Sequence, residues 1–388
     1  MMENKLQEIT GHFNSGDIHL GTNRLLDLAL DTYKPEIYRK TLDWYSWMML
    51  NMDASASVIN EKTNPVLLTI IDSLKNTGES HSQNILELDK IGKTYSKGNF
   101  SLKPLTFTVK SGEVTGLVGE NGNGKTTLLR ILARELKEDR GSIEYLIPEV
   151  PADNDYLLKS NLVYVPQRIP RWYGTLMDNL QFTLSIHGTF SEENTLRATL
   201  MIARMGLMPY KNLTWNQISS GYKTRFELAK SLLRKPKLLL LDEPLANLDI
   251  ISQQTVLQDL KMMACSVTSP FGMVLSSQQL YEVEKISDQI IFLKDGEAKY
   301  QNNNVQTENQ EVLHILYEIE TKAERNSIVM AFAGSIEPEI TFNGGVYILK
   351  FPSGTSTQSV LSGLARMDHE VLYIRNISQS SRRFFIKS

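Results

Sequence analysis

The segment LVGENGNGKTT, residues 117–127, sets the architecture of this chain. It fits the spacing G-x-x-x-x-G-K-[ST] through Gly119, Gly124, Lys125 and Thr126, between a strand-like run and the helical run LLRILARELK. The glycines let backbone N–H groups point at phosphate oxygens, and the following helix adds the positive end of its dipole. The segment therefore predicts a nucleotide phosphate site at the end of a strand in an α/β sheet.

Individual residues of this loop have separate expected roles. Lys125 is expected to reach the β- and γ-phosphates, and the Thr126 hydroxyl is expected to bind Mg²⁺. Gly122 suits a tight loop, and Asn121 and Thr127 complete the set expected to contact nucleotide. A glycine-rich turn with a chance Lys-Thr pair is the alternative, and it leaves the flanking strand and helix unexplained.

A second segment, KLLLLDEPLANLD at 237–249, reduces the number of enzyme classes that fit the phosphate loop. Its leucines are typical of a strand buried on both faces of a parallel sheet, and they lead directly into Asp242 and Glu243. Adjacent acids at the end of such a strand are costly unless a metal, water or an opposite charge satisfies them. We expect Asp242 to bind Mg²⁺ through water and Glu243 to polarise the attacking water. An exposed Asp-Glu turn before Pro244 is the alternative.

Changes of pattern along the chain predict three domains. Residues 1–84 carry apolar residues at helical spacing and are expected to form a small all-α domain. Residues 85–300 alternate strand and helix patterns and are expected to be α/β. Residues 301–388 predict the order βαββαβ of a ferredoxin-like α+β domain, with Asn343-Gly344-Gly345 as a hairpin turn.

Two features of the N-terminal helices are specific enough to test. Pro35 is expected in the first turn of one helix, and NPVLLTIIDSLKN suggests another helix with Pro65 near its start. The segment EIYRKTLDWYSWMML concentrates aromatic residues, which form either a partner surface or the core of the small domain: Tyr38, Trp44, Tyr45 and Trp47.

Composition excludes several classes of protein. The chain has 388 residues, a formal net charge of −3 and no block rich in Lys and Arg, so we expect no nucleic-acid partner. The single cysteine, Cys265, rules out a disulfide within the chain and a zinc site built on paired cysteines, and we expect it to be buried. No apolar run approaches the ~20 residues that cross a bilayer, so we expect a cytoplasmic protein whose membrane-spanning partner is another chain.

These motifs resemble the ATP-binding-cassette (ABC) ATPases over residues 85 to 300. Besides the phosphate loop and the acidic pair, the resemblance rests on four elements in the order of the family. They are Tyr95 upstream of the loop, Gln167 in VYVPQR, the signature-like ISSGYKTRFELAKSLL at 218–233, and ANLD at 246–249.

The resemblance implies a fold and a mechanism. The fold is a P-loop nucleotide-binding domain with a helical subdomain, and the cofactors are ATP and Mg²⁺. Tyr95 would stack on adenine, and Gln167 would contact Mg²⁺ and water. The residues that would bind nucleotide held by a second copy of the chain are Ser219, Ser220, Gly221 and Asp249.

The resemblance also implies partners. Two copies would sandwich two ATP molecules, and hydrolysis would open the dimer. The dimer would drive a separate multi-spanning membrane permease, of export type, from the cytoplasmic face of the membrane. Trp172 and Tyr173, after Gln167, are either an exposed contact for that permease or part of the core of the helical subdomain.

The chain departs from the family pattern at three positions. Ser220 replaces the usual first Gly of the signature and Tyr222 replaces a common Gln. In LSSQQLYEVEKISDQ, residues 275–289, Gln278 stands where the family has a His that orients the catalytic Glu. Either Gln278 donates a hydrogen bond to the γ-phosphate and turnover is slower but real, or the site binds ATP and serves as a regulatory switch outside transport.

Overall fold

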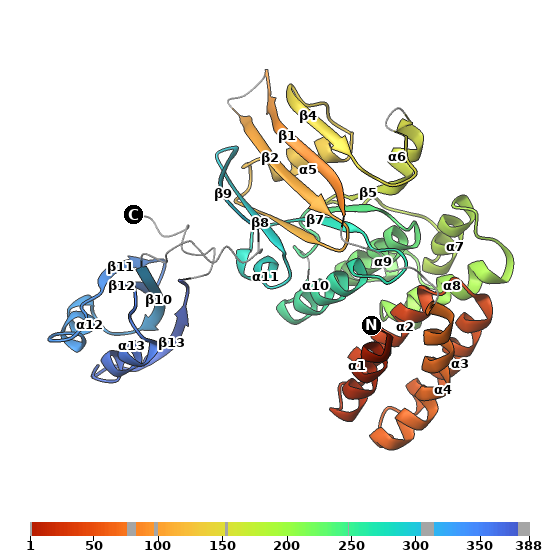
Figure 1. The fold of residues 1–388 in the computed structure, drawn as a ribbon, viewed down its shortest axis with the longest axis horizontal. Coiled ribbons are helices and arrows are strands. Elements are labelled where there is room, and N and C mark those ends of the chain that lie inside the picture. The colour runs from red at the N-terminus through yellow and green to blue at the C-terminus, as the bar shows by residue number, and fades with distance from the viewer. Residues whose placement is uncertain are drawn as a thin grey trace. The chain divides into compact units, whose positions relative to one another are not determined.

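The computed structural model describes residues 2–75, 83–96, 100–151, 154–246, 248–303 and 314–378. The chain divides into two compact units, Met1–Gln301 and Asn302–Ser388. Figure 1 shows the helices and strands of each unit. The further division at residues 84 and 300 into three domains remains a prediction.

The first unit is built on a six-stranded sheet with the strand order β5-β6-β7-β3-β8-β9 (Figure 1). The pairs from β5 to β8 are parallel. Continuous apolar runs on β3 and β6 are buried throughout, as expected of strands covered on both faces. The bounds are β3 (Val114–Val118), β5 (Leu162–Val165), β6 (Leu238–Leu241), β7 (Gly272–Ser277), β8 (Gln289–Lys294) and β9 (Glu297–Asn303).

A second, antiparallel sheet has the order β2-β1-β4, with β1 (Asn84–Thr94), β2 (Ser101–Lys110) and β4 (Arg140–Tyr145). Helix α5 (Lys125–Leu132) follows the phosphate loop, and its apolar side chains belong to the same buried cluster as residues of both sheets. This packing fixes the start of α5, and with it the phosphate loop, against the rest of the unit.

The remaining helices of this part of the unit follow β4 in the chain. Helices α7, α8 and α9 pack against one another. The bounds are α6 (Asp155–Asn161), α7 (Leu176–Ile186), α8 (Ser191–Arg204), α9 (Ser220–Leu233), α10 (Ile250–Ala264) and α11 (Leu280–Glu284). Trp172 is buried, with its ring 4.3 Å from that of Phe226, whereas Tyr173 is 81% exposed. Each alternative therefore holds for one residue of the pair: Trp172 belongs to the core, and Tyr173 lies on the surface.

The N-terminal segment forms the helices α1 (Met2–Asn14), α2 (Ile18–Leu30), α3 (Pro35–Leu50) and α4 (Ala56–Leu74). Pro35 occupies the first turn of α3, as predicted. The prediction that Pro65 begins a helix is wrong, because α4 starts at Ala56 and contains Pro65. An internal proline costs ~3 kcal/mol. Helix α4 continues through it because Ile59 is buried and the Thr63 hydroxyl accepts a hydrogen bond from the Trp44 indole at 3.1 Å.

The aromatic cluster of the N-terminal helices is core. Tyr38, Trp44 and Tyr45 are buried in one cluster with apolar residues of all four helices and with Leu200 and Ala203 of α8. The N-terminal helices therefore pack directly on α8. The expectation for Cys265 is wrong: it is exposed at the end of α10, because it caps that helix instead of facing the core.

A buried ion network joins these helices to the cassette. The Arg204 side chain, on α8, has no exposed surface, and its guanidinium lies 2.6 Å from Asp27 on α2 and 3.0 Å from Asp259 on α10. Burial raises the pKa of the Asp27 carboxyl, and the positive charge of Arg204 opposes that rise. The network thus depends on all three partners, because the Arg204 charge is fully removed from water and the two carboxylates are partly removed from it.

The second unit is an antiparallel sheet with two helices. Its order along the chain is β10 (His314–Thr321), α12 (Arg325–Ala331), β11 (Glu339–Asn343), β12 (Val346–Pro352), α13 (Thr357–Leu364) and β13 (Val371–Asn376). The sheet order is β11-β12-β10-β13. Gly344 and Gly345 have φ of 59° and 98° and connect β11 to β12, which is the predicted hairpin. The element order is that of the prediction, while the ferredoxin-like assignment remains a prediction.

Within the described ranges, none of the helices combines the length and the apolar character needed to span a lipid bilayer.

We predict that Arg204→Met destabilises the first unit by about 3–5 kcal/mol, because it leaves the partly buried carboxylates of Asp27 and Asp259 without the cation that compensates them. Urea unfolding followed by far-UV circular dichroism measures this loss. Arg39→Met is the matched control, since Arg39 also joins the N-terminal helices to α8, through an exposed ion pair with Glu192. Exposed pairs contribute little. Equal destabilisation by the two variants would contradict the assigned role of the buried network.

Candidate nucleotide site

The phosphate loop connects β3 to α5 and is shaped by glycines. A Cβ atom at Gly119 would lie 2.4 Å from the backbone oxygen of Leu293, and one at Gly124 would lie 2.7 Å from the Phe100 ring. Gly124 also has φ of 99°, a conformation that other residues rarely adopt. The loop therefore keeps its backbone N–H groups open to a phosphate only with glycine at these positions.

Lys125 lies at the centre of the loop. Its ammonium group donates to the backbone oxygens of Gly119 at 2.7 Å and Glu120 at 3.1 Å. It also forms an ion pair at 3.1 Å with Glu243, and the two side chains are 4% and 8% exposed. The predicted phosphate-binding cation and the predicted catalytic acid are therefore in contact, although they are far apart in the sequence.

Asp242 is buried at the carboxyl end of β6 and accepts hydrogen bonds from three hydroxyl groups. The Thr126 and Ser276 hydroxyls donate at 2.8 Å, and the Tyr164 hydroxyl lies at 3.3 Å. Burial raises the pKa of the Tyr164 hydroxyl, and the negative charge of Asp242 raises it further. These neutral donors orient the carboxylate without cancelling its charge, which remains available to a cation.

Glu243 receives donors from three sides. The side-chain amides of Gln167 and Gln278 donate to the same carboxylate oxygen at 3.1 Å and 2.7 Å, and Lys125 contacts the other oxygen. Its backbone has φ of 47°, and its N–H donates to the Ser276 hydroxyl at 2.9 Å. The residue in the position of the family histidine thus contacts the predicted base directly.

Sequence reasoning missed Ser276 and Tyr164. The Ser276 hydroxyl is fully buried and bridges the two acids, since it donates to the Asp242 carboxylate and accepts from the Glu243 N–H. Its only signal in the sequence is a polar residue at the end of an apolar strand. That signal has no meaning until β7 is known to pair with β6, which brings Ser276 beside the acids.

The other predicted nucleotide contacts of the loop lie around this centre. Tyr95 is 37% exposed, and its hydroxyl lies 3.3 Å from that of Thr127. Asn121 and Gly122 are exposed or partly exposed in the loop, and a Cβ at Gly122 would meet open space. Tyr95 therefore presents its ring beside the start of α5, where a base can reach it.

Ser219 of the signature-like segment and Asp249 of the ANLD segment, which corresponds to the D-loop of the ABC family, serve as helix caps. The Ser219 side chain accepts from the N–H of Tyr222 and caps α9, and Asp249 accepts from the N–H of Ser252 at 3.0 Å and caps α10. Ser219, Ser220 and Asp249 are exposed, and Gly221 is partly exposed. The D-loop residue at position 247 lies outside the described residues. These groups are thus presented at the surface, where a second molecule can meet them.

The donor set fits Mg²⁺ together with a nucleotide. Mg²⁺ is usually bound by one or two carboxylates plus substrate phosphates and water. Thr126, Asp242 and Gln167 offer a hydroxyl, a carboxylate and an amide oxygen next to the phosphate loop. Among the described residues there is no cluster of three or more His, Cys, Asp or Glu side chains suited to hold a metal without such a substrate.

Comparison with known proteins points to the same class. The protein-family model described as ABC transporter matches residues 102–246. The phosphonates import ATP-binding protein PhnC of Treponema denticola is 29% identical over 242 residues, which cover 59% of this chain and 93% of PhnC. The probable multidrug ABC transporter ATP-binding protein YbhF of Escherichia coli is 34% identical over 204 residues, which cover 52% of this chain and 34% of YbhF.

A solved structure shares the fold. It is the dimeric structure of a post-hydrolysis state of the ATP-binding cassette MJ0796 bound to ADP and Pi. It is 26% identical, with a TM-score of 0.50, over 56% of this chain and 98% of that one.

The fold and the loop define a P-loop nucleotide-binding domain. More particularly, residues 102–246 match the ABC transporter family and form a nucleotide-binding domain of that type, with helices before it in the chain and an antiparallel sheet domain after it. The family prediction agrees with these comparisons over that domain. The export type is not confirmed, because the relatives include a phosphonate importer and a multidrug transporter.

We predict that Ser276→Ala destabilises the protein by about 1–3 kcal/mol, because it removes a donor from buried Asp242 and an acceptor from the Glu243 N–H. The measurement is the midpoint of urea unfolding. Ser277→Ala is the control, since that hydroxyl hydrogen-bonds Gln279 in its own loop and contacts neither acid. A larger loss for Ser277→Ala than for Ser276→Ala would show that the bridge between the acids contributes little.

Proposed function

We propose that this protein binds MgATP in the phosphate loop and hydrolyses it to drive a membrane transporter. The observation that carries the proposal is the ion pair between Lys125 and Glu243, since it joins the phosphate-binding cation to an acid already held by Gln167 and Gln278. A kinase or GTPase would share the loop, but the signature-like segment at 218–233 and the ABC family match favour the cassette ATPases.

Nucleotide binding would exchange the partner of Lys125. In the structure, the ammonium group is neutralised by Glu243. The β- and γ-phosphates of ATP carry more negative charge and would take over Lys125 together with the backbone N–H groups of the loop. Glu243 would then be free to act on water, so substrate binding itself would release the base.

Hydrolysis needs an oriented base. Glu243 would accept a proton from the water that attacks the γ-phosphorus, yielding ADP and inorganic phosphate. Gln167 and Gln278 donate to one carboxylate oxygen, which leaves the other oxygen for the water once Lys125 has moved to the phosphates. Gln278 would therefore act as a positioning residue, through Glu243, in addition to any contact with the γ-phosphate.

Thr126, Asp242 and Gln167 would hold Mg²⁺, which would neutralise charge on the phosphate oxygens. The three hydroxyl donors to Asp242 support this role because they fix the carboxylate direction before the cation arrives. Tyr95, beside Thr127, would stack on the adenine ring.

The exposed residues of the signature-like segment can be reached by a second molecule. We infer that Ser219, Ser220, Gly221 and Asp249 of one copy would close over the nucleotide of a second copy. The exposed N–H groups at the start of α9 suit a γ-phosphate. The dimeric form of the related MJ0796 cassette supports the inference.

The membrane partner would be a separate multi-spanning chain, and the protein would work on the cytoplasmic face of the membrane. Tyr173, on the surface beside α7, is a candidate contact with it. Detergent extraction followed by affinity purification of the full chain should recover such a membrane protein.

We predict that Glu243→Gln lowers the turnover number for ATP by about 10²–10⁴-fold, the usual contribution of a general base. The variant should also accumulate as an ATP-bound dimer, seen by size-exclusion chromatography with and without MgATP. Glu297→Gln, which removes a carboxylate from an exposed ion pair with Lys299, is the control and should behave as wild type. Unchanged turnover in Glu243→Gln would reject the assignment of the base.

We predict that Gln278→Ala lowers the turnover number with little change in KM for ATP, because the substitution removes a donor to Glu243 and no contact of the phosphate loop. Steady-state phosphate release measures both constants, and Gln278→His tests whether a ring N–H restores or raises turnover. Background turnover in the wild type, with intact ATP binding, would instead favour a nucleotide-gated regulatory module that does not act in transport.

A further inference from the structure

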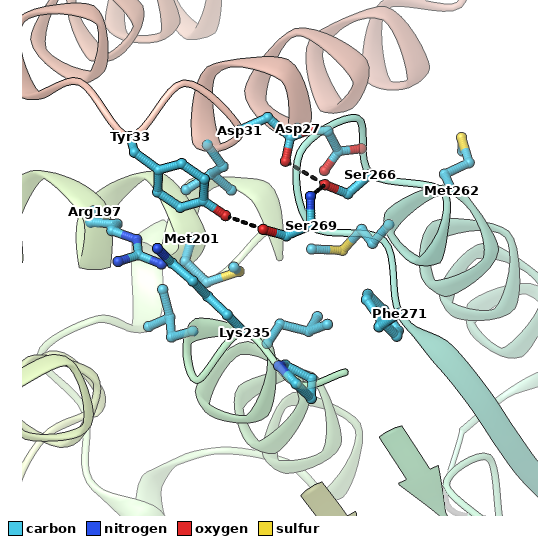
Figure 2. A pocket seen from close by; sticks show the side chains of 15 residues that line it. Asp27, Asp31, Tyr33, Arg197, Met201, Lys235, Met262, Ser266, Ser269 and Phe271 are labelled. Atoms are coloured by element: carbon cyan, nitrogen blue, oxygen red, sulfur yellow. Dashed lines mark hydrogen bonds between the residues drawn. The ribbon is translucent and has the colours of Figure 1, made fainter. Parts of the chain in front are cut away.

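A second pocket lies where the N-terminal helices meet the cassette, and the phosphate loop contributes none of its lining (Figure 2). Its cavity is about 80 Å³. One wall is the connection between α2 and α3, which carries Asp31 and Tyr33. The facing walls carry Arg197 of α8, Lys235 after α9, and the segment between α10 and β7 with Ser269.

Two cations share the ring of Tyr33. The Lys235 ammonium group lies 3.5 Å from the ring centroid, and the Arg197 guanidinium carbon lies 5.3 Å from it. Figure 2 shows both charged groups together below the ring, and the Tyr33 hydroxyl pairs with that of Ser269 at 2.7 Å. A tyrosine ring attracts cations, but it does not neutralise them.

Neither cation has a carboxylate partner within 4.0 Å among the residues that the structure describes. Arg197 is only 5% exposed, and its guanidinium donates to the Thr189 hydroxyl at 3.3 Å. Arginine does not lose its proton in proteins, so a buried guanidinium without a counter-charge is costly. An anion that enters the pocket would remove that cost.

The carboxylates of Asp27 and Asp31, which line the pocket, already have hydrogen-bond or ion-pair partners elsewhere. Asp31 accepts from the Ser266 hydroxyl at 2.6 Å and from the N–H of Val267 at 2.9 Å. Asp27 is paired with Arg204. These carboxylates therefore face other partners and do not neutralise the pair beside Tyr33.

The charges around Lys235 agree with this geometry. Desolvation lowers the pKa of its ammonium group to about 8, and the positive charge of Arg197 lowers it further. Glu193 has a smaller, opposite effect, and Lys237 adds to the lowering. Lys235 therefore lies close to a second positive charge, that of Arg197.

We propose that this pocket binds a small divalent oxyanion of phosphate size, held by Arg197 and Lys235 beside Tyr33. A single water needs about 10–15 Å³ of such cavity space, so the observed volume holds several waters or one oxyanion. Arginine and lysine are the side chains that bind phosphate groups most readily. The site is independent of ATP hydrolysis.

Binding at this place would couple the N-terminal helices to the cassette. Tyr33 belongs to the first and both cations to the second, so the anion would strengthen the contact between them. Tyr33 and Lys235 have a left-handed backbone conformation, with φ of 52° and 55°. This conformation fixes the direction in which each side chain points. The N-terminal helices would then act as a sensor of phosphate or of a phosphorylated small molecule.

Competitive acylation of lysines, mapped by peptide mass spectrometry on the full chain, tests the proposal. Inorganic phosphate should slow acylation of Lys235 in proportion to 1 + [phosphate]/Kd. Lys223, which lies 4.8 Å over the ring of Trp215, is the internal control and should be unaffected. The measurement distinguishes this site from the phosphate loop, because phosphate bound in the loop would slow the acylation of Lys125, which lies on a different peptide.

Sodium chloride at equal ionic strength and sodium acetate are run in parallel. Protection of Lys235 by phosphate, weaker protection by acetate and none by chloride would support the proposal. Equal protection by chloride would reveal charge screening only, and stronger protection by acetate would assign a carboxylate ligand; either result overturns the proposal.

Arg197→Met should abolish the protection, and Arg171→Met is its control, because Arg171 lies 5.6 Å over the exposed Tyr173 ring. Since Arg197 is buried, Lys235→Met gives a second measurement on an exposed side chain. In a Lys125→Ala background, which weakens the phosphate loop, phosphate should raise the melting temperature, and adding Lys235→Met should remove that rise. A rise that persists with Lys235→Met would overturn the proposal.

Discussion

The contact between Lys125 and Glu243 organises the first unit, because it can form only if the ends of three strands meet at one edge of the sheet. The phosphate loop follows β3, the acids follow β6, and Ser276 and Gln278 come from the end of β7. Parallel pairing aligns these carboxyl ends. The apolar strands thus hold a lysine and two carboxylates at low exposure, and two exposed side-chain amides reach one of these carboxylates from the surface. The same pairing makes the base dependent on the phosphate site.

The N-terminal helices are joined to the nucleotide-binding part of the first unit by polar contacts as well as by apolar packing. Arg204 pairs with acids of α2 and α10, and Asp31 caps the segment after α10 through the Ser266 hydroxyl and the Val267 N–H. Loss of one partner in such contacts lowers the stability of the fold strongly, because it leaves an unpaired charge in the interior. They place the N-terminal helices where they can influence the cassette, and the Tyr33 pocket lies in this junction.

The two cation sites of the first unit differ in how they are neutralised. Lys125 has an internal counter-charge, Glu243, which ATP would replace. Arg197 and Lys235 have none within ion-pair distance in the part of the chain described, and they lie against an aromatic ring instead. One site is therefore poised for exchange of partners and the other for capture of an anion. For Lys125 and Arg197, which are both buried, this contrast follows from the same electrostatic rule, that a buried charge is costly unless it is paired.

Local spacing was sufficient to place the phosphate loop between a strand and a helix, the acidic pair at the end of a buried strand, the hairpin at Gly344 and the order of elements in the second unit, because each depends on neighbours in the chain. It failed at Pro65, Cys265, Ser276 and the division between Trp172 and Tyr173. At these positions residues distant in sequence set the outcome: Trp44 supports the helix through Pro65, and β6 gives Ser276 its partners. A site made of consecutive residues can be predicted from the sequence. Contacts between strands and helices that are distant in the sequence exist only after folding has brought those elements together.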